Sequence, residues 1–420
     1  MKRNKKQSNL FKTIQNYSVE ITVFLYLLFQ LIFHVSKSVY GFVTAWYVTD
    51  YSIGVSSRLL VGSILRILFG DYITAEQVYI FLILTFIVLI LLVSILSGYM
   101  IRKTTDSVEK TGAVFLLAMY LASPAAPGYL WVDENMGRLD TFLYFLTLIL
   151  IVVAFKVKNQ LIRYSLLGIL GVVCVLTHQV YFFLFFPVLL TILLQDWFES
   201  DFKKTVLLGA VLVITAVAVV FLFFQFGGGV NYSTPEELTS VLQSRTNLPI
   251  SNSTILYEYF WTIKDHFVNN MLPELRERVR FGIITVVLLA PVFIIYLSLW
   301  IKAIYNASVK KDKIKYLLIL FTNVLYIPVF ALMTDWGRWF AAFITVQCFS
   351  FLYLTGVRDK GIKNGLVQLG DKIRKYPFLF VSIILYLSLF DKFEAINYLP
   401  QVETFYYTIY NIKTIILAVL

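Results

Sequence analysis

The strongest constraint on the fold is a succession of long apolar runs, most of them close to the length that crosses a lipid bilayer. A membrane-spanning helix needs about 20 mostly apolar residues. Hydrophobic residues make up 59% of the 420-residue chain and charged residues only 15%, against about 45–50% and about 25% in soluble domains. This composition excludes a soluble enzyme, a disordered chain and a disulfide scaffold. We therefore predict an all-α, polytopic transmembrane helical bundle of about 12 spans, at residues 19–36, 78–98, 111–128, 139–156, 162–177, 179–195, 205–226, 281–302, 316–333, 339–356, 377–391 and 404–420.

The spans leave no obvious domain boundary, so we interpret residues 1–420 as a single integral-membrane domain. The apolar stretch 162–195 is too long for one span, and it predicts two short helices hinged at Thr177-His178-Gln179. Residues 227–280 form the longest stretch between spans, a large extracytoplasmic loop. Within this loop, Pro235 directly after Thr234 indicates the start of a helix.

Positive charge sets the orientation of the bundle. Of the 36 Lys and Arg residues, 24 lie in every second connection, which marks these connections as cytoplasmic. Both termini are then cytoplasmic in a multi-pass protein of the cell membrane, and the Lys-, Ile- and Phe-rich usage favours a bacterial source. Topology accounts for the net charge of +11, so nucleic acid is not needed as a partner. The basic segments are 1–12, 102–110, 156–163, 203–204, 302–315 and 358–375.

Polar residues of another kind gather in the connections predicted to lie outside. Ionisable residues next to lipid are costly, and they are functional candidates by default. A first group follows the first span, a second follows the third, a third is the hinge, and a fourth follows the ninth. The candidates are Asp50 and Arg58; Asp133, Glu134, Arg138 and Asp140; His178; and Asp335 and Arg338.

Asp50 precedes a stretch, Ser52–Gly70, that we predict to be a helix in the membrane interface. Arg58, Gly62 and Arg66 are spaced i, i+4, i+8 and would share one face of that helix. A re-entrant or simply buried helix is the alternative. Asp50 would then lie just before the N-terminus, where it is either a functional carboxylate or a helix cap.

Each of the other candidates also has a structural interpretation. Arg138 could form a plain ion pair with Asp140 or Glu134. The adjacent Asp133 and Glu134 could be a solvated loop, a base, or part of a divalent-metal site, although no cofactor is certain.

The hinge and the last short turn have alternatives of the same kind. His178 could be a phosphate partner, a proton carrier, a ligand or a core residue bonded to a carbonyl group. Gly337 would allow a sharp turn that holds Arg338, whose planar guanidinium suits phosphate. The tryptophans beside it, Trp336 and Trp339, form either an interfacial belt or sugar-stacking faces. We expect Asp50, Arg138, His178 and Arg338 to line one cavity open to the outside and to lipid.

In the order of its first 160 residues, the chain resembles the GT-C superfamily of integral-membrane glycosyltransferases. The matching features are a span, an external loop with an acidic residue (Asp50), a juxtamembrane helix (Ser52–Gly70) and a further acidic motif after the third span. Many members carry paired acids in the first loop, where this chain has one. The resemblance implies a polyprenyl-phosphate-linked sugar donor, with membrane lipid around it, and a glycan or lipid-linked acceptor at the outer face.

The resemblance also implies roles for individual residues. Asp50 would be the general base that takes the acceptor proton. Arg138, His178 and Arg338 would offset charge on the departing phosphate, and Asp133 or Glu134 would orient the acceptor or a metal ion.

Two other functions fit the same sequence. One is a polysaccharide repeat-unit polymerase of the O-antigen or capsule type, which Arg276, Arg278 and Arg280 in the large loop favour. The other is a transporter or flippase of lipid-linked oligosaccharides, which would need charges at mid-membrane and broken helices in both halves.

Overall fold

The computed structural model describes residues 16–200 and 203–394 of the chain, and these residues are almost entirely helical. Twelve helices form the main bundle, α2 (Ser18–His34), α4 (Ala75–Arg102), α5 (Ser107–Ala122), α6 (Asp140–Lys156), α7 (Gln160–Thr177), α9 (Phe186–Glu199), α10 (Lys204–Phe226), α15 (Ala290–Asn306), α16 (Lys310–Phe321), α17 (Tyr326–Leu332), α18 (Trp336–Gly356) and α20 (Pro377–Leu387). The all-α class is confirmed. The predicted span 404–420 lies outside the described residues.

Short elements and several longer helices outside the bundle make up the rest of the described residues. Short antiparallel strands, β1 (Gly54–Val55) and β2 (Gly229–Val230), join the segment after α2 to the large loop. The other elements are η1 (Gly41–Tyr47), α3 (Leu59–Phe69), η2 (Pro127–Trp131), η3 (Asp133–Asn135), α8 (Tyr181–Leu184), α11 (Pro235–Gln243), α12 (Asn252–Ile255), η4 (Leu256–Phe260), α13 (Ile263–His266), η5 (Phe267–Met271), α14 (Leu272–Leu288), η6 (Thr322–Leu325) and α19 (Lys360–Lys375).

Apolar helices of membrane-spanning length identify a membrane protein. In the described part of the chain, six helices are long and apolar enough to cross a bilayer, or seven if one bent pair counts as a span. Large apolar side chains are exposed along their outer faces, as Leu84 on α4 and Leu212 on α10 illustrate. A soluble surface would not carry such belts. The predicted number of about 12 is not reached by this measure, partly because α2 and α6 have only 17 residues and α9 only 14.

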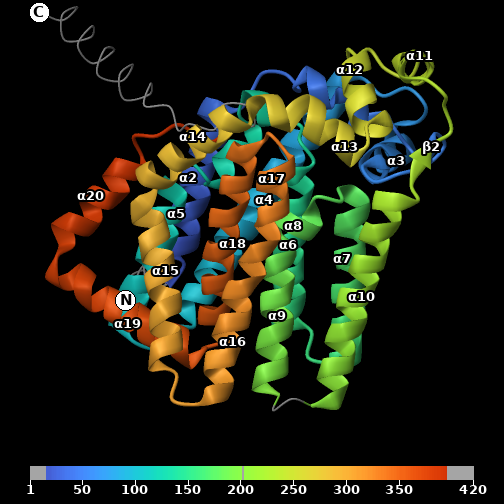
Figure 1. Ribbon diagram of the computed structural model, residues 1–420. Helices are drawn as coiled ribbons and strands as arrows, with labels where there is room; N and C mark the ends of the chain where they lie inside the picture. The colour runs from blue at the N-terminus through green and yellow to red at the C-terminus, as the bar shows by residue number, and fades with distance from the viewer. Residues whose placement is uncertain (1–15, 201–202, 395–420) are drawn as a thin grey trace, which may run out of the picture.

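The bundle has two different ends. Figure 1 shows the α9–α10 and α15–α16 connections at its lower end with α19, and these segments contain three of the basic clusters. At the upper end lie α3 and the helices α11 to α14. The two sets of connections that the sequence analysis separated by charge are thus also separated in space.

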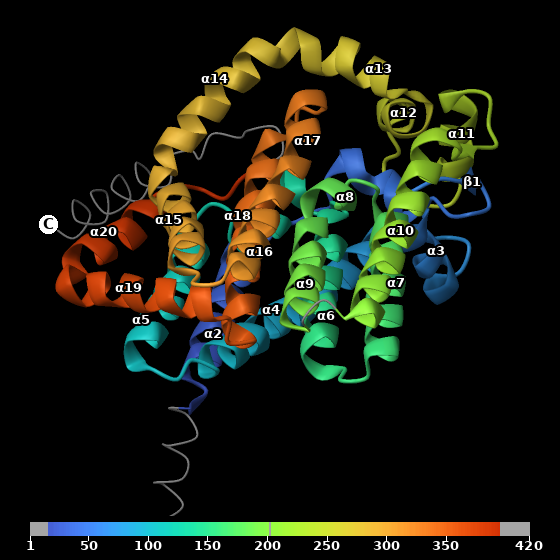
Figure 2. The same cartoon turned by 60° about the horizontal axis from the view of Figure 1, so that its bottom comes forward.

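The predicted span 281–302 is wrong as a single helix. The chain runs as a helix from Ile263 to Leu288, bends by 71°, and continues as α15. Pro291 lies in the first turn of α15, which explains why the helix restarts there. Figure 2 shows α13 and α14 as an arc along the upper rim that leads from α12 to α15. The large loop is therefore largely helical, and its first helix begins as predicted, with Thr234 as N-cap and Pro235 in the first turn.

The helix predicted at Ser52–Gly70 is shorter than expected. It is α3, which begins at Leu59, because Arg58 has a left-handed backbone (φ 73°) that ends any helix before it. Arg58 therefore does not share a helix face with Gly62 and Arg66, which both lie inside α3. Gly62 has a packing role instead, since a β-carbon there would lie 1.9 Å from the Thr49 carbonyl oxygen. In Figure 1, α3 lies across the direction of the bundle helices.

Helix α18 is the centre of the bundle. Almost every one of its side chains is buried, and it packs against α4, α5 and α9. Its N-terminus carries Asp335 and Arg338 to the upper end of the bundle. Gly337 lies inside the first turn of this helix, so its predicted role in a sharp turn is wrong.

Candidate functional site

A cavity of about 390 Å³ opens at the upper end of the bundle, beneath the arc of α13 and α14. Its wall combines charged and aromatic side chains from the segment after α2, the hinge after α7, the large loop and the start of α18. Five predicted site residues line it, Arg58, Arg138, His178, Asp335 and Arg338. Its volume falls in the range of small-molecule sites.

One part of the wall is a chain of alternating positive and negative side chains. Arg338 binds Asp140 with two hydrogen bonds, Nε to Oδ2 at 2.6 Å and Nη2 to Oδ1 at 2.8 Å. Arg338 also binds Asp335, which accepts a second bond from Arg138 at 3.3 Å. The side chains of Arg138, Arg338 and Asp140 are at most 5% exposed, so these charges are held almost free of water. The Arg138–Asp140 ion pair, one of the structural alternatives for Arg138, is wrong, because Asp140 pairs with Arg338.

The loop before α6 fixes the position of Arg138. Gly137 has φ +95°, and a β-carbon there would meet Val39 and Val43. The Tyr47 hydroxyl donates to the Gly137 carbonyl, and Arg138 Nε donates to the Glu134 carbonyl at 2.9 Å. The backbone thus turns sharply and holds the guanidinium against the cavity.

Asp335 stays ionised in this setting. Burial works to raise the pKa of Asp335, but the charges of Arg138 and Arg338 and a hydrogen bond from Arg338 bring it below its ordinary value. The carboxylate therefore bridges two guanidinium groups as an anion.

A second ion pair lies across the cavity. Arg58, at the N-terminus of α3, contacts Glu258 of η4. Burial lowers the pKa of Arg58 to about 10, which leaves the group charged at neutral pH. The guanidinium lies 6.0 Å from the ring centre of Trp46, a distance at which a cation and an aromatic face attract each other.

His178 lies at the end of α7, and its side chain borders the cavity while 4% of the residue is exposed. Burial, together with the nearby charges of Arg58, Arg338 and Arg138, lowers the pKa of His178 well below 6.5. The ring is thus neutral at pH 7. The Val180 backbone N–H donates to its Nδ1 at 3.4 Å, which places the ring proton on Nε2.

The four arginines of the wall are balanced by three carboxylates of the wall and by Asp140 behind it. Arg278 of α14 contacts Glu274 one turn away, so each arginine named so far in the wall has a carboxylate partner. A guanidinium has five N–H groups, and one carboxylate uses at most two or three of them. The site can therefore bind an anion through the remaining donors without carrying a large net positive charge.

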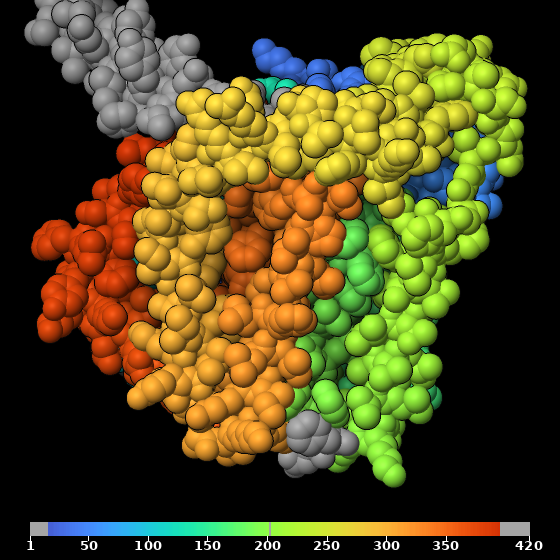
Figure 3. Space-filling view, viewed as in Figure 1, coloured from blue at the N-terminus to red at the C-terminus, as the bar shows by residue number. Residues whose placement is uncertain are grey.

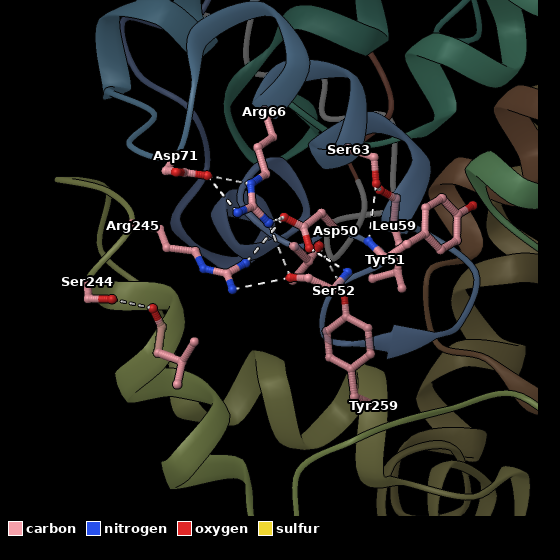
Figure 4. Close-up of polar contacts among 12 residues, drawn as sticks. Asp50, Tyr51, Ser52, Leu59, Ser63, Arg66, Asp71, Ser244, Arg245 and Tyr259 are labelled. Carbon is pink, nitrogen blue, oxygen red and sulfur yellow. Dashed lines mark hydrogen bonds and ion pairs between the residues drawn. The ribbon is translucent and has the colours of Figure 1, made fainter.

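Asp50 does not line this cavity. Figure 4 shows its carboxylate between Arg66 of α3 and Arg245, which follows α11. Arg66 Nη1 lies 2.6 Å and Arg245 Nη1 3.4 Å from Oδ2, and the Ser52 backbone N–H donates to Oδ1 at 2.7 Å. Burial raises the pKa of Asp50, but the hydrogen bonds from Ser52 and Arg66 and the charge of Arg245 lower it by more. The pKa of Asp50 therefore lies below its ordinary value.

The predicted acidic pair after α5 also lies apart from the cavity. Asp133 is exposed and Glu134 half-buried in the short helix η3, and neither borders the cavity. Across residues 16–200 and 203–394, no three His, Cys, Asp or Glu side chains gather as metal ligands would.

Sequence reasoning named Arg278 of the large loop only for the polymerase alternative and missed the rest of the loop's contribution to the cavity. Glu258, Glu274 and Arg278 border the cavity, with Tyr257, Trp261 and His266. A signal was present: the segment 257–261 is unusually aromatic for a solvated loop and contains one carboxylate. These loop residues could not be placed in a site from the sequence, because a loop has no periodic pattern that indicates which of its side chains are buried.

An apolar groove of about 450 Å³ lies next to the cavity. It is bordered by Leu275 and Val279 of α14, Phe293 of α15, Phe330 of α17 and Phe340 of α18. Their sequence neighbours on α14, Glu274 and Arg278, border the cavity instead. In Figure 3 the hollow between α15 and the α16–α17 column corresponds to this groove. The groove and the cavity thus share α14, α17 and α18 as walls but have no lining residue in common.

Comparisons of the chain with protein-family models, with curated proteins and with solved structures find no match, so any functional assignment rests on the site itself.

Proposed function

We propose that this protein is a membrane glycosyltransferase that moves a sugar from a polyprenyl-phosphate-linked donor to an acceptor at the extracytoplasmic face, in cell-surface polysaccharide or glycoconjugate assembly. The observation that carries the proposal is an arginine-lined cavity with an apolar groove beside it, the two sharing α14, α17 and α18 as walls. In this proposal the membrane topology is GT-C-like, with about 12 spans and α3 as the juxtamembrane helix. The basic end of the bundle is cytoplasmic, and so are both termini.

The donor fits the two compartments by its chemistry. A polyprenyl chain is apolar and would lie in the groove between α15 and α17. Its phosphate would then reach Arg138, Arg278 and Arg338, which offer several N–H donors in a site almost free of water. Charge that develops on the leaving phosphate would be stabilised most strongly in such a setting.

The sugar would occupy the aromatic part of the cavity. Trp46 and Trp261 lie on that side, and aromatic faces are suited to the apolar faces of sugar rings. Neutral His178 would donate from Nε2 to a hydroxyl or phosphate oxygen, and it cannot act as an acid at neutral pH.

Two carboxylates are candidates for the general base. The resemblance implies Asp50, whose lowered pKa and two arginine partners make it a weak base away from the cavity. Glu258 borders the cavity, with a single arginine partner, and we assign the base to it. Asp133 and Glu134 would then contact the acceptor outside the cavity.

The experiment is a transfer assay with the purified full chain in nanodiscs and synthetic polyprenyl-phosphate sugars. We expect Glu258→Gln to lose about 10²–10⁴-fold in rate, the usual contribution of a positioned base. Asp50→Asn is the matched control and should stay within a few fold of the wild type. The opposite result would return the base to Asp50, and an absence of transfer from every such donor would contradict the proposed function.

A repeat-unit polymerase is the second candidate, and one observation favours it. Arg278, from the arginine-rich part of the large loop, borders the cavity, as an oligosaccharide pyrophosphate substrate would require. A deletion strain distinguishes the two, because loss of a polymerase leaves single repeat units on a gel, whereas loss of a transferase leaves a glycan that lacks one sugar. A transporter or flippase has the least support.

A further inference from the structure

A second apolar groove lies at the other end of the bundle and has no part in the site described above. It encloses about 380 Å³ between α10 and α16, with α9 as its floor. Representative wall residues are Leu193 and Trp197 of α9, Leu207 and Ile214 of α10, and Leu318 of α16. Figure 3 shows it as a hollow between the α16 and α10 surfaces, where green atoms of α9 are visible.

Aromatic packing separates this groove from the cavity. Phe182 stacks on Phe186 at 5.0 Å and on Phe221 at 4.6 Å, and Phe183 meets Phe221 at 5.4 Å. These rings come from α8, α9 and α10, above the groove walls. A chain in this groove would therefore not extend into the cavity.

The groove walls continue into cations at the basic end. On α10, Lys203 and Lys204 lie one turn before Leu207, and both are exposed. On α16, Lys311 lies two turns before Leu318 and therefore on the same face. Acidic side chains at the same end are Asp196, Glu199 and Asp312, and Asp196 contacts Arg163. Glu199 already lies 3.5 Å from Lys315, which is buried against Asp359.

We propose that this groove binds one anionic phospholipid of the leaflet at the basic end, with an acyl chain along α9 and the phosphate at Lys203, Lys204 and Lys311. The length agrees: from Lys204 to Ile214 a helix rises about 15 Å, half of a hydrocarbon core of about 30 Å. The wall is apolar, which excludes a polar occupant. The three lysines on the two walls select an anionic headgroup over a zwitterionic one. Trp197 lies at the same end of α9, where interfacial tryptophans are common.

Native mass spectrometry of the purified full chain tests the proposal, after equilibration with equal amounts of phosphatidylglycerol and phosphatidylcholine. We expect the wild type to retain phosphatidylglycerol in excess. Each lysine near a surface contributes roughly fivefold to anionic-lipid binding. Lys203→Gln/Lys204→Gln/Lys311→Gln should therefore lower the ratio of the two retained lipids by at least about fivefold. The matched control, Lys360→Gln/Lys363→Gln/Lys372→Gln, removes equal charge from α19 and should leave the ratio unchanged.

A groove-filling variant tests the acyl chain separately. Ala210→Trp places a large ring in the groove and should abolish retention of both lipids, with helix content and melting temperature measured to show that the chain is folded. Val211→Trp, at a half-exposed wall position, is the fallback if Ala210→Trp does not fold, and it should also lower retention. An unchanged ratio in the triple variant of the rim, or full retention in a folded groove-filling variant, would overturn the proposal.

Discussion

Two clusters of aspartate and arginine lie at the upper end of this protein, and they differ in what surrounds them. In the Asp50 cluster the carboxylate is only 6% exposed, but the side chains of Arg66 and Arg245 are 39% and 21% exposed. In the Asp140 cluster, the side chains of Arg138 and Arg338 are 5% and 4% exposed. The residue types are identical, but only the second cluster borders the cavity. The difference teaches that burial, rather than the presence of an acid near an arginine, identifies the costly and therefore informative charges.

The largest expected effect comes from breaking the buried cluster. Arg338→Met leaves Asp140 charged and buried without its two-point partner, so we expect a loss of about 3–5 kcal/mol in stability and a loss of sugar transfer. Unfolding in detergent measures the first. The double variant Asp140→Leu/Arg338→Met removes both charges and should recover most of the stability but none of the transfer. If the single variant were as stable as the wild type, the buried cluster would not differ from the exposed one.

The helices and the sequence positions of the clusters could be predicted, whereas their partners could not. Apolar runs of sufficient length identify helices by composition alone, which is why α4, α10 and α18 match their predicted spans. The restart of a helix at Pro291 was missed because the apolar run continues through the bend. Asp335 and Arg338 are three residues apart and pair locally, but Asp140 and Arg338 are 198 residues apart, and only tertiary packing brings them together.

Local backbone geometry explains the other corrections. A regular i, i+4, i+8 spacing places Arg58 and Arg66 together only if the helix includes Arg58, and the left-handed backbone at that residue excludes it. Arg58 consequently turns toward Glu258 and the cavity, while Arg66 turns to Asp50. Glu258 itself carries no pattern that distinguishes it from the other acids of the large loop, so its place in the site required the fold.

The pH dependence of the free energy of unfolding tests whether His178, beside the buried cluster, is as shielded from water as that cluster. Its folded pKa lies well below the unfolded value of about 6.5, so the unfolded chain binds the proton more readily. Wild-type stability should fall as the pH drops below about 6.5, by about 2 kcal/mol at pH 5. His178→Gln should lose less stability over the same range. Unfolding curves of the wild type and of His178→Gln between pH 7 and pH 5 measure this difference. If the free energy of unfolding fell equally with pH in both proteins, water would have to reach the His178 ring.

The smallest expected effect comes from breaking the exposed cluster. Arg245→Gln removes one of two arginines from Asp50, and Arg66 keeps its 2.6 Å contact, so the carboxylate stays paired. Arg245 is reached by solvent and its contact with Asp50 is long at 3.4 Å, so we expect a contribution near that of surface pairs, about 0.2–1 kcal/mol, which weakens in salt. We expect a small decrease in the unfolding midpoint at low ionic strength, which disappears in about 0.5 M salt, and an unchanged transfer rate. Because Arg245 also belongs to the segment that pairs with Ile73 through its backbone carbonyl, the side-chain change leaves that link intact. A loss above about 2 kcal/mol, insensitive to salt, would mean that Asp50 holds the large loop over the cavity as firmly as the buried cluster holds α18, and the contrast between the two clusters would fail.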